Sequence, residues 1–242
     1  QGTPRQDAFS LAQDGTPDAP RFVVASVCDG VGSRANSQEA ADLVSSEVVR
    51  LAALGLPWEV AFSAANDSLI SHVDLTQRPM ATTVVALRVR RESDLWIGTV
   101  AWIGDSSAWH LDLDGSWDQI GGILPDDDDG YHSGSVSPLP SADGACEQRD
   151  FELSGGAIFL LSDGLANPLK WSSAVQESLA KWWSQPPDHF TFAAQVDFAM
   201  KGHVDDRTAV GLWFEPSSTD LSAAEARSGL AQDVAEGDVS RE

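Results

Sequence analysis

The sequence predicts an α+β fold built around a large antiparallel sheet. Short runs of β-branched and aromatic residues fill the middle of the chain, and their spacing suits hairpins rather than βαβ crossovers. Helical patterns lie before and after most of these runs instead of alternating with them. With 242 residues, of which 42% are hydrophobic, the chain is long enough to bury one sizeable core.

One strand and two helices are expected first. Residues 21–28 (RFVVASVC) form an apolar run that ends at Asp-Gly, which predicts a buried strand leading into a loop. A helix follows from Asn36, because one helical face carries Ala40, Val44, Val48 and Leu51. Pro57 opens a second helix, with an apolar stripe of Phe62, Ala65, Leu69 and Val73.

Strands make up most of the remaining chain. Apolar β runs predict them at 82–89, 94–103, 108–113, around 117, and at 151–153, 157–162 and 208–214. Helical patterns near 172–184 and 189–200 precede the last strand. Residues 121–145 contain Gly, Pro, Ser and the run Asp126–Asp129, which predicts a long loop, and loops of this length are usually functional or disordered.

Residues 1–215 are therefore expected to form one domain. From residue 216 the chain changes to Ser, Ala, Gly and charged residues, without any aromatic residue. Six acidic residues and two arginines give this segment a charge of −4, which predicts a disordered acidic tail over residues 216–242.

The charge of the chain restricts its partners. There are 37 acidic and 15 basic side chains, so the net charge is −22 at pH 7, which argues against binding to nucleic acid or to an anionic membrane surface and favours cations. Only Cys28 and Cys146 are cysteines, and they fit neither a disulfide framework nor a zinc site. We expect a cytoplasmic protein, because no apolar run approaches the roughly 20 residues that cross a bilayer and no secretory leader opens the sequence.

Four aspartates adjoin apolar β runs: Asp29 in VVASVCDG, Asp105 in VAWIGDS, Asp163 in IFLLSDG and Asp206 in DDRTAVGLWF. Carboxylates at the ends of buried strands are costly to hold together unless a cation offsets their charge. All-oxygen sites of this kind suit Mg²⁺ or Mn²⁺. Each Asp-Gly pair taken alone is explained at least as well as the turn that closes a strand.

Six segments, taken in order, resemble the metal-dependent protein phosphatase family of the PP2C type. They are GTPRQDAF at 2–9, VCDGVGS at 27–33, MATTVVAL at 80–87, WIGDSSAWHL at 102–111, IFLLSDGL at 158–165 and VDDRTAVGL at 204–212. Each segment alone is weak evidence, but all six occur in the family's order and span about residues 2–214. The resemblance implies a bacterial-like serine/threonine phosphatase with a four-layer α-β-β-α sandwich, in which helices flank two antiparallel sheets.

The resemblance also implies a metal centre. Asp29 matches the aspartate that bridges two catalytic metal ions, and the Gly30 carbonyl matches a ligand of the second ion. Asp163 and Asp206 match the other carboxylates on the first ion. Asp105 matches a ligand of a third ion, which it shares with Asp163.

The N-terminal segment departs in part from the family pattern. Gln6 stands where the family has a metal-bound Glu, and Asp7 matches the adjacent aspartate that holds metal-bound water. The family's phosphate-gripping Arg falls at Gly2, and Arg5 is the candidate substitute. Two further departures are Ser33, in place of a Gly, and Arg207, in place of an Asn.

The resemblance implies hydrolysis of phosphoserine and phosphothreonine on proteins. Two Mn²⁺ or Mg²⁺ ions, with a third at Asp105, would activate a water for in-line attack on phosphorus. The partner would be a phosphoprotein, the substrate of a serine/threonine kinase, and we expect a monomer. His203 is a candidate proton donor to the leaving oxygen, although such a histidine is more often a solvated loop residue.

Two other functions stay open. A degenerate PP2C-like module would bind metal or phosphoprotein without turnover, as Gly2, Gln6 and Ser33 suggest, whereas the retained aspartates oppose it. A non-catalytic acidic cation-binding module does not explain why the six segments keep their order.

Overall fold

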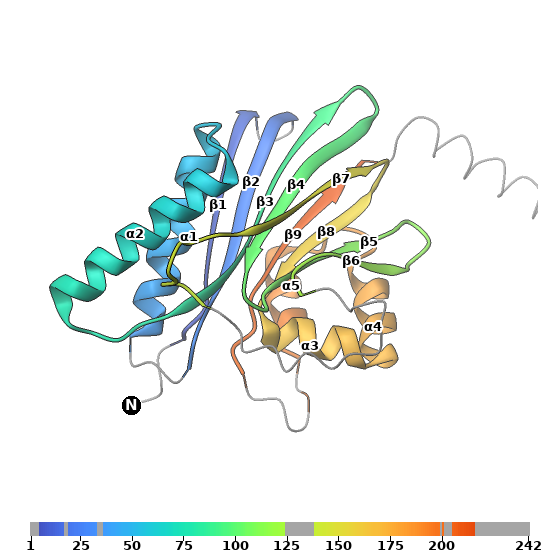
Figure 1. Ribbon diagram of the computed structural model, residues 1–242. Coiled ribbons are helices and arrows are strands. Elements are labelled where there is room, and N and C mark those ends of the chain that lie inside the picture. Colours follow the sequence, from blue (N-terminus) through green and yellow to red (C-terminus); the bar gives the residue numbers. More distant parts are fainter. Residues whose placement is uncertain are drawn as a thin grey trace, which may run out of the picture.

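The structure, a computed structural model, describes residues 5–16, 19–32, 36–123, 138–198, 200 and 205–215. These residues form four layers, in which two antiparallel sheets pack face to face and helices cover the outer face of each (Figure 1). The predicted α+β class and the α-β-β-α order are confirmed. The predicted tail over residues 216–242 and the Asp126–Asp129 run lie outside the described residues.

The first sheet has five strands in the order β1-β2-β3-β4-β7, all antiparallel to their neighbours. Their bounds are Ala8–Thr16, Ala19–Gly30, Thr82–Glu92, Leu95–Ile103 and Glu147–Leu153. Gly30 of β2 pairs with Thr82, and Val84 of β3 pairs with Ile103 of β4. The carboxyl ends of β2 and β4 therefore lie at the same end of the sheet.

The second sheet has four strands in the order β6-β5-β8-β9. Their bounds are Trp117–Gly121, Ser107–Leu111, Gly156–Leu161 and Ala209–Phe214. Leu161, the last residue of β8, pairs with both Ser107 and Ala209. The end of β8 therefore lies beside the first residues of β5 and β9.

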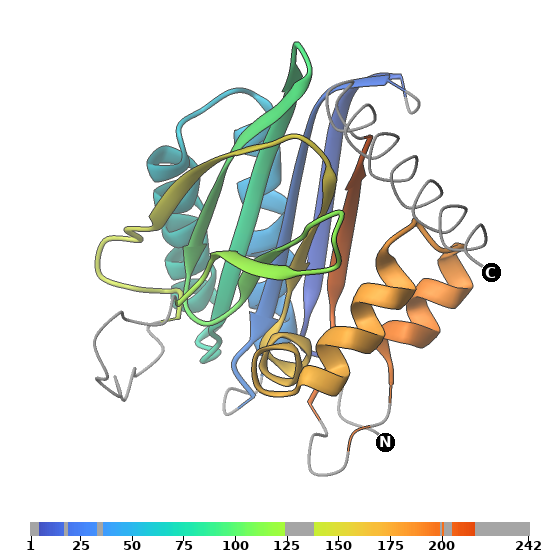
Figure 2. The same cartoon turned by 90° about the vertical axis from the view of Figure 1, so that its right-hand side faces the viewer.

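Two groups of helices cover the sheets. Helices α1 (Ser37–Ala53) and α2 (Trp58–Thr76) lie on the first sheet. Helices α3 (Asp163–Trp171), α4 (Ser173–Trp183) and α5 (His189–Val196) lie on the second sheet, as the side view in Figure 2 shows. No helix within the described ranges combines the length and the apolar character needed to cross a bilayer.

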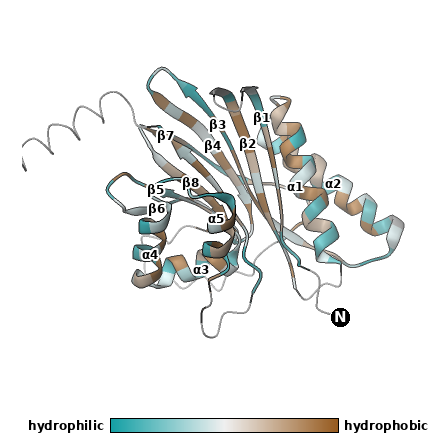
Figure 3. Cartoon of the chain, turned by 180° about the vertical axis from the view of Figure 1, so that it is seen from behind, coloured by the Kyte–Doolittle hydropathy of each residue, from teal (hydrophilic) through white to brown (hydrophobic). Residues whose placement is uncertain are grey.

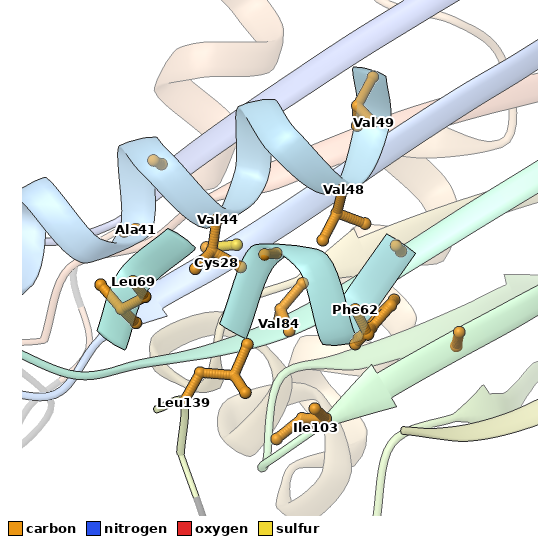
Figure 4. Packing of buried hydrophobic residues seen from close by; sticks show 14 of the residues in the cluster. Cys28, Ala41, Val44, Val48, Val49, Phe62, Leu69, Val84, Ile103 and Leu139 are labelled. Carbon is orange, nitrogen blue, oxygen red and sulfur yellow. The ribbon is translucent and has the colours of Figure 1, made fainter. Parts of the chain in front are cut away.

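Strand β2 contributes to two hydrophobic cores because successive side chains point to opposite faces of a strand. Val24 and Cys28 are fully buried in the core below α1 and α2, and Figure 4 shows Val44 of α1 beside Cys28. Val23 and Val27, on the other face, belong to the core between the two sheets. The expected buried strand therefore lies between the core below α1 and α2 and the core between the two sheets.

A third core joins the second sheet to its helices and contains several aromatic rings. The ring of Phe159 stacks on Trp183 with 4.7 Å between the ring centroids, and the indole nitrogen of Trp213 donates a 2.7 Å hydrogen bond to the Trp183 carbonyl. Trp182, the neighbour of Trp183 in α4, is 41% exposed. Of these two adjacent tryptophans, Trp183 therefore faces the core and Trp182 faces solvent.

The two ends of the first sheet differ in polarity. Hydrophilic colouring dominates the turn between β3 and β4 in Figure 3, where Arg90, Arg91 and Glu92 end β3. The opposite end carries Asp29 and Thr83, which pair in the β2–β3 ladder. Asp29 is thus separated from Arg90 and Arg91 by most of the length of β3.

Two elements were not expected as such. Strand β1 carries only small residues on its buried face, where Ala8 is 8% exposed, while Phe9 and Leu11 face solvent at 63% and 51%. Helix α3 contains Pro168, which the sequence pattern reads as a helix breaker. In both cases tertiary packing, rather than local pattern, forms the element.

Candidate metal and phosphate site

The carboxyl ends of β2 and β4 and the start of α3 lie at one end of the sandwich, the lower end in Figure 1. Asp29 is the next-to-last residue of β2, and Asp105 follows β4 by two residues. Asp163 is the first residue of α3, and Asp206 lies three residues before β9. Strand pairing within each sheet and the packing of the two sheets therefore bring together residues that are far apart in the sequence.

Threonine and serine side chains connect the strands at this end. The hydroxyls of Thr83 and Ser106 are 2.7 Å apart and form a buried hydrogen bond, which links β3 to the turn that carries Asp105. Thr82 donates a 2.8 Å hydrogen bond to the carbonyl oxygen of Asp29. These bonds fix the backbone on both sides of the carboxylates.

The N-terminal segment is bound to the second sheet through two carboxylates. The backbone amide of Gln6 donates a 2.7 Å hydrogen bond to Oδ2 of Asp206. The carboxyl of Asp7 accepts hydrogen bonds from the side chains of Ser162 and Thr208. The structure thus places the predicted Gln6, Asp7 and Asp206 next to one another.

Gly30 lies where the N-terminal segment runs alongside the end of β2. A Cβ atom at Gly30 would be 2.6 Å from the carbonyl oxygen of Gln6 and 2.8 Å from Cβ of Ser37, so a side chain does not fit there. The side-chain oxygen Oε1 of Gln6 would lie 3.1 Å from a Cβ on Gly32. Gln6 therefore faces the Gly30–Gly32 turn with both its backbone and its side-chain oxygen.

Asp29 has the most perturbed environment of the predicted residues. Burial, the charge of Asp7 and a hydrogen bond with the carboxyl of Asp163 raise the pKa of Asp29 to about 10. The charge of Asp105 contributes in the same direction. Asp29 and Asp163 are therefore within hydrogen-bond reach, and in the absence of a cation their shared site favours a proton.

Three further carboxyls show the same tendency. Burial raises the pKa of Asp7, and the charge of Asp206 adds to the rise. Burial and the charge of Asp163 raise the pKa values of both Asp105 and Asp205. Mutual repulsion thus extends from Asp7 to Asp205, and the prediction had not given Asp205 a role of its own.

Two buried carboxylate oxygens indicate whether the residues of this site suit a cation. Oδ2 of Asp7 and Oδ1 of Asp163 are buried, and neither has a hydrogen-bond partner among the described residues. Leaving a buried carboxylate oxygen unpaired is costly, and hard divalent cations take oxygen ligands. The residues present therefore fit a hard cation, although no three His, Cys, Asp or Glu side chains in the described part of the chain are already arranged to hold one.

Arg5, the candidate for binding substrate phosphate, is exposed and anchored at one nitrogen. Its Nη2 donates a 2.7 Å hydrogen bond to Oγ1 of Thr208 and another hydrogen bond to the carbonyl oxygen of Arg207. The charge of Arg5 partly offsets the rise in the pKa of Asp7. Arg5 therefore lies at the border of the acidic site.

Some predicted residues cannot be placed, and some neighbours were missed. Gly2, Ser33 and His203 lie outside the described residues. Ser162 and Thr208, whose side chains bind the carboxyl of Asp7, were not predicted as site residues. Their only signal is that each hydroxyl residue lies within two positions of a predicted aspartate.

Comparisons with known proteins agree with this fold. The sequence profile of the family described as Protein phosphatase 2C matches residues 1–190. A search of curated proteins finds no match. Among solved structures, the chain is similar to the serine/threonine phosphatase Stp1 from Staphylococcus aureus, with a TM-score of 0.64 and 17% identity over 88% of this chain and 90% of that one.

Two other solved structures are also similar. The serine/threonine phosphatase PstP/Ppp from Mycobacterium tuberculosis has a TM-score of 0.55 and 20% identity, covering 86% of this chain and 99% of that one. RsbX in complex with magnesium has a TM-score of 0.56 and 15% identity, covering 87% of this chain and 88% of that one. At these identities the likeness concerns the fold.

Proposed function

The chain belongs to the protein phosphatase 2C family, and on this premise we propose that it hydrolyses phosphoserine and phosphothreonine on proteins with bound Mn²⁺ or Mg²⁺. The observation that carries the proposal is the group of buried, mutually repelling carboxyls around Asp29. Asp29 shares a hydrogen bond with Asp163, and an oxygen of Asp163 has no partner among the described residues. A divalent cation would replace the proton that Asp29 otherwise keeps.

We assign the metal-binding roles to Asp29, the Gly30 carbonyl, Asp163 and Asp206, with Asp105 on the side of a third ion. Divalent ions held there would supply an activated water and offset the charge that develops on the phosphoryl oxygens. The chain itself orients the ligands: the Gln6 amide fixes the carboxylate of Asp206.

Asp7 is held for a different task. Its carboxyl is fixed by Ser162 and Thr208, so it is oriented to accept a proton or to hold a water at the oxygen that has no partner among the described residues. Gln6 carries no charge, so the second ion would be held less tightly than by a carboxylate.

Arg5 is proposed to bind the substrate phosphate. A guanidinium presents five N–H donors, and the hydrogen bonds from Nη2 to Thr208 and to Arg207 use only one nitrogen. The anchored side chain would hold two phosphate oxygens without first losing rotamer entropy.

The second candidate function is a module that binds metal or phosphoprotein without turnover. The neutral Gln6, which lies against Gly30, favours it, because a weakly held second ion would lower turnover before it abolished binding. We further propose that the protein is monomeric and cytoplasmic and that its substrates are proteins phosphorylated by serine/threonine kinases. The charge of −22 suits cations better than nucleic acid or a membrane.

Hydrolysis of p-nitrophenyl phosphate and of a phosphothreonine peptide, with Mn²⁺ and with chelator, tests the proposal. We expect turnover only with the metal, and loss of turnover in Asp29→Asn. Asp143→Asn is the matched control, because Asp143 is a turn aspartate that accepts a hydrogen bond from the Ala145 amide, and its neighbour Gly144 packs against Asn66 of α2. Calorimetric binding of Mn²⁺ without any hydrolysis would establish the non-catalytic module instead.

A further inference from the structure

We propose that Arg207 is a positioning residue: it supplies the hydrogen bond that Pro168 removes from helix α3 and thereby holds the Asp163–Gly164 corner against Asp206. Only the expected effect on catalysis rests on the proposed function. The contacts by which Arg207 holds this corner are present in the protein without metal.

Pro168 leaves one carbonyl of the helix without its usual donor. In an α-helix the amide of each residue donates to the carbonyl four residues earlier, and proline has no amide hydrogen. Pro168 lies inside α3, so the carbonyl of Gly164 receives no such bond from it. Gly164 is buried, and a buried carbonyl without a partner destabilises the fold.

Arg207 fills this position. Its Nε donates a 3.0 Å hydrogen bond to the carbonyl oxygen of Gly164, and its Nη1 donates to the carbonyl oxygen of Phe198. The guanidinium carbon lies 4.7 Å from the centre of the Phe198 ring. The planar guanidinium of Arg207, the residue that follows Asp206, therefore joins the first turn of α3 to the segment after α5.

The backbone at Gly164 is packed too closely against Asp206 for any residue with a side chain. A Cβ atom on Gly164 would lie 2.1 Å from the carbonyl oxygen of Asp206 and 3.3 Å from Cβ of Asp205. Gly164 thus touches the chain next to the Arg207 hydrogen bond. Ser162 and Thr208 also join these two segments, through hydrogen bonds of 3.0 Å from the Ser162 amide to the Thr208 carbonyl and from the Thr208 amide to Oγ of Ser162. Because Asp163 precedes Gly164 and Asp206 precedes Arg207, the Arg207 bond extends this connection to the helix side of the two carboxylates.

Loss of the hydrogen bond between Arg207 and Gly164 would loosen the arrangement of Asp163 and Asp206 without removing either carboxylate. Groups that orient metal ligands typically change metal affinity or activity by about 10- to 100-fold when they are mutated. We therefore expect Arg207→Ala to weaken Mn²⁺ binding within that range and to lower kcat more than it changes KM. Arg207→Lys, which keeps the charge but not the planar fork, should recover only part of the loss.

The chain contains a matched control in Arg88. Its Nη1 donates hydrogen bonds to the carbonyls of Ala52 at 3.5 Å and Leu56 at 3.2 Å, and its guanidinium lies 5.5 Å from the ring centre of Trp58. Arg88 therefore makes the same kinds of contact on the opposite side of the first sheet. Arg88→Ala should lower the melting temperature as Arg207→Ala does, but leave Mn²⁺ affinity at the wild-type value.

Pro168→Ala provides the second test. It restores an amide that can bind the Gly164 carbonyl, so Arg207→Ala should cost less in Mn²⁺ affinity in this background than in the wild-type background. Hydrogen exchange of the full chain in chelator gives the metal-free readout. The amides of Leu165 and Ala166, which bind the Ser162 carbonyl at 3.1 and 2.9 Å, should exchange faster in Arg207→Ala and not in Arg88→Ala.

The outcomes separate this inference from the proposed function. If the wild type fails to hydrolyse phosphopeptides or to bind Mn²⁺, the proposed function fails, while the exchange at Leu165 and Ala166 still decides the positioning role. Unchanged exchange in Arg207→Ala would overturn the inference. So would equal losses of Mn²⁺ affinity in Arg207→Ala and Arg88→Ala, or strictly additive effects of Pro168→Ala and Arg207→Ala.

Discussion

The backbone amide of Gln6 donates a 2.7 Å hydrogen bond to Oδ2 of Asp206, a residue 200 positions later in the chain. This bond joins the segment before β1 to the segment before β9 at one of the predicted metal ligands. It also means that the carboxylate of Asp206 is oriented before any ligand arrives, which lowers the entropy lost on metal binding.

Mn²⁺ should stabilise the protein against heat. A cation that binds only the folded state raises the free energy of unfolding by mass action, by about 2.7 kcal/mol when its free concentration is 100 times its Kd. The melting temperature is expected to rise with Mn²⁺ and to fall with chelator, and Asp29→Asn should reduce the gain. Superimposable melting curves, together with no heat of binding in calorimetry, would contradict the metal site.

Asp105→Asn should lower turnover and leave the fold intact. Asparagine keeps the size and the hydrogen-bonding oxygen that a turn needs but removes the charge that a cation needs. We expect a loss of kcat on the order of 100-fold at saturating Mn²⁺, with the melting temperature unchanged. Asp143→Asn again serves as the control, and a kcat near the wild-type value would withdraw Asp105 from the catalytic residues.

Arg5→Ala should raise KM for a phosphopeptide by about 10-fold or more, because a hydrogen bond to a charged group contributes about 1.5–3 kcal/mol. Mn²⁺ affinity, measured by calorimetry, should change less. Arg21→Ala is the control, since Arg21 is an exposed arginine that pairs only with Asp14 among the described residues. A wild-type KM in Arg5→Ala would assign the phosphate to another group.

The N-terminus of α5 should show a pH-dependent contribution to stability. Oγ1 and the backbone amide of Thr191, together with the amide of Phe190, bind the carboxylate of Asp188 and lower its pKa. A lowered pKa means that the stabilisation is present above the ordinary pKa of about 4 and is lost as the pH falls below it. Asp188→Asn keeps a capping oxygen, so melting temperatures at pH 7 and pH 3 should differ less in this variant; an equal difference would exclude the cap.

The class of the fold and most of its elements could be predicted from the amino-acid sequence. Short continuous apolar runs predicted strands such as β3 and β8, which are buried along most of their length, and period-3.6 patterns predicted α1 and α2, because a surface helix buries only one face. The aspartates at the strand ends were also visible, since Asp and Gly after an apolar run mark the end of a strand.

Tertiary structure decided what those aspartates do to one another. Only the packing of the two sheets brings Asp29 within a hydrogen bond of Asp163 and brings Ser162 and Thr208 to Asp7, and these partners are separated by more than 100 residues in the sequence. The same holds for Arg207, which the sequence shows only as a departure from a family pattern. That its guanidinium replaces the amide missing at Pro168 follows from the close approach of Gly164 to Asp206, a contact between segments that no local pattern encodes.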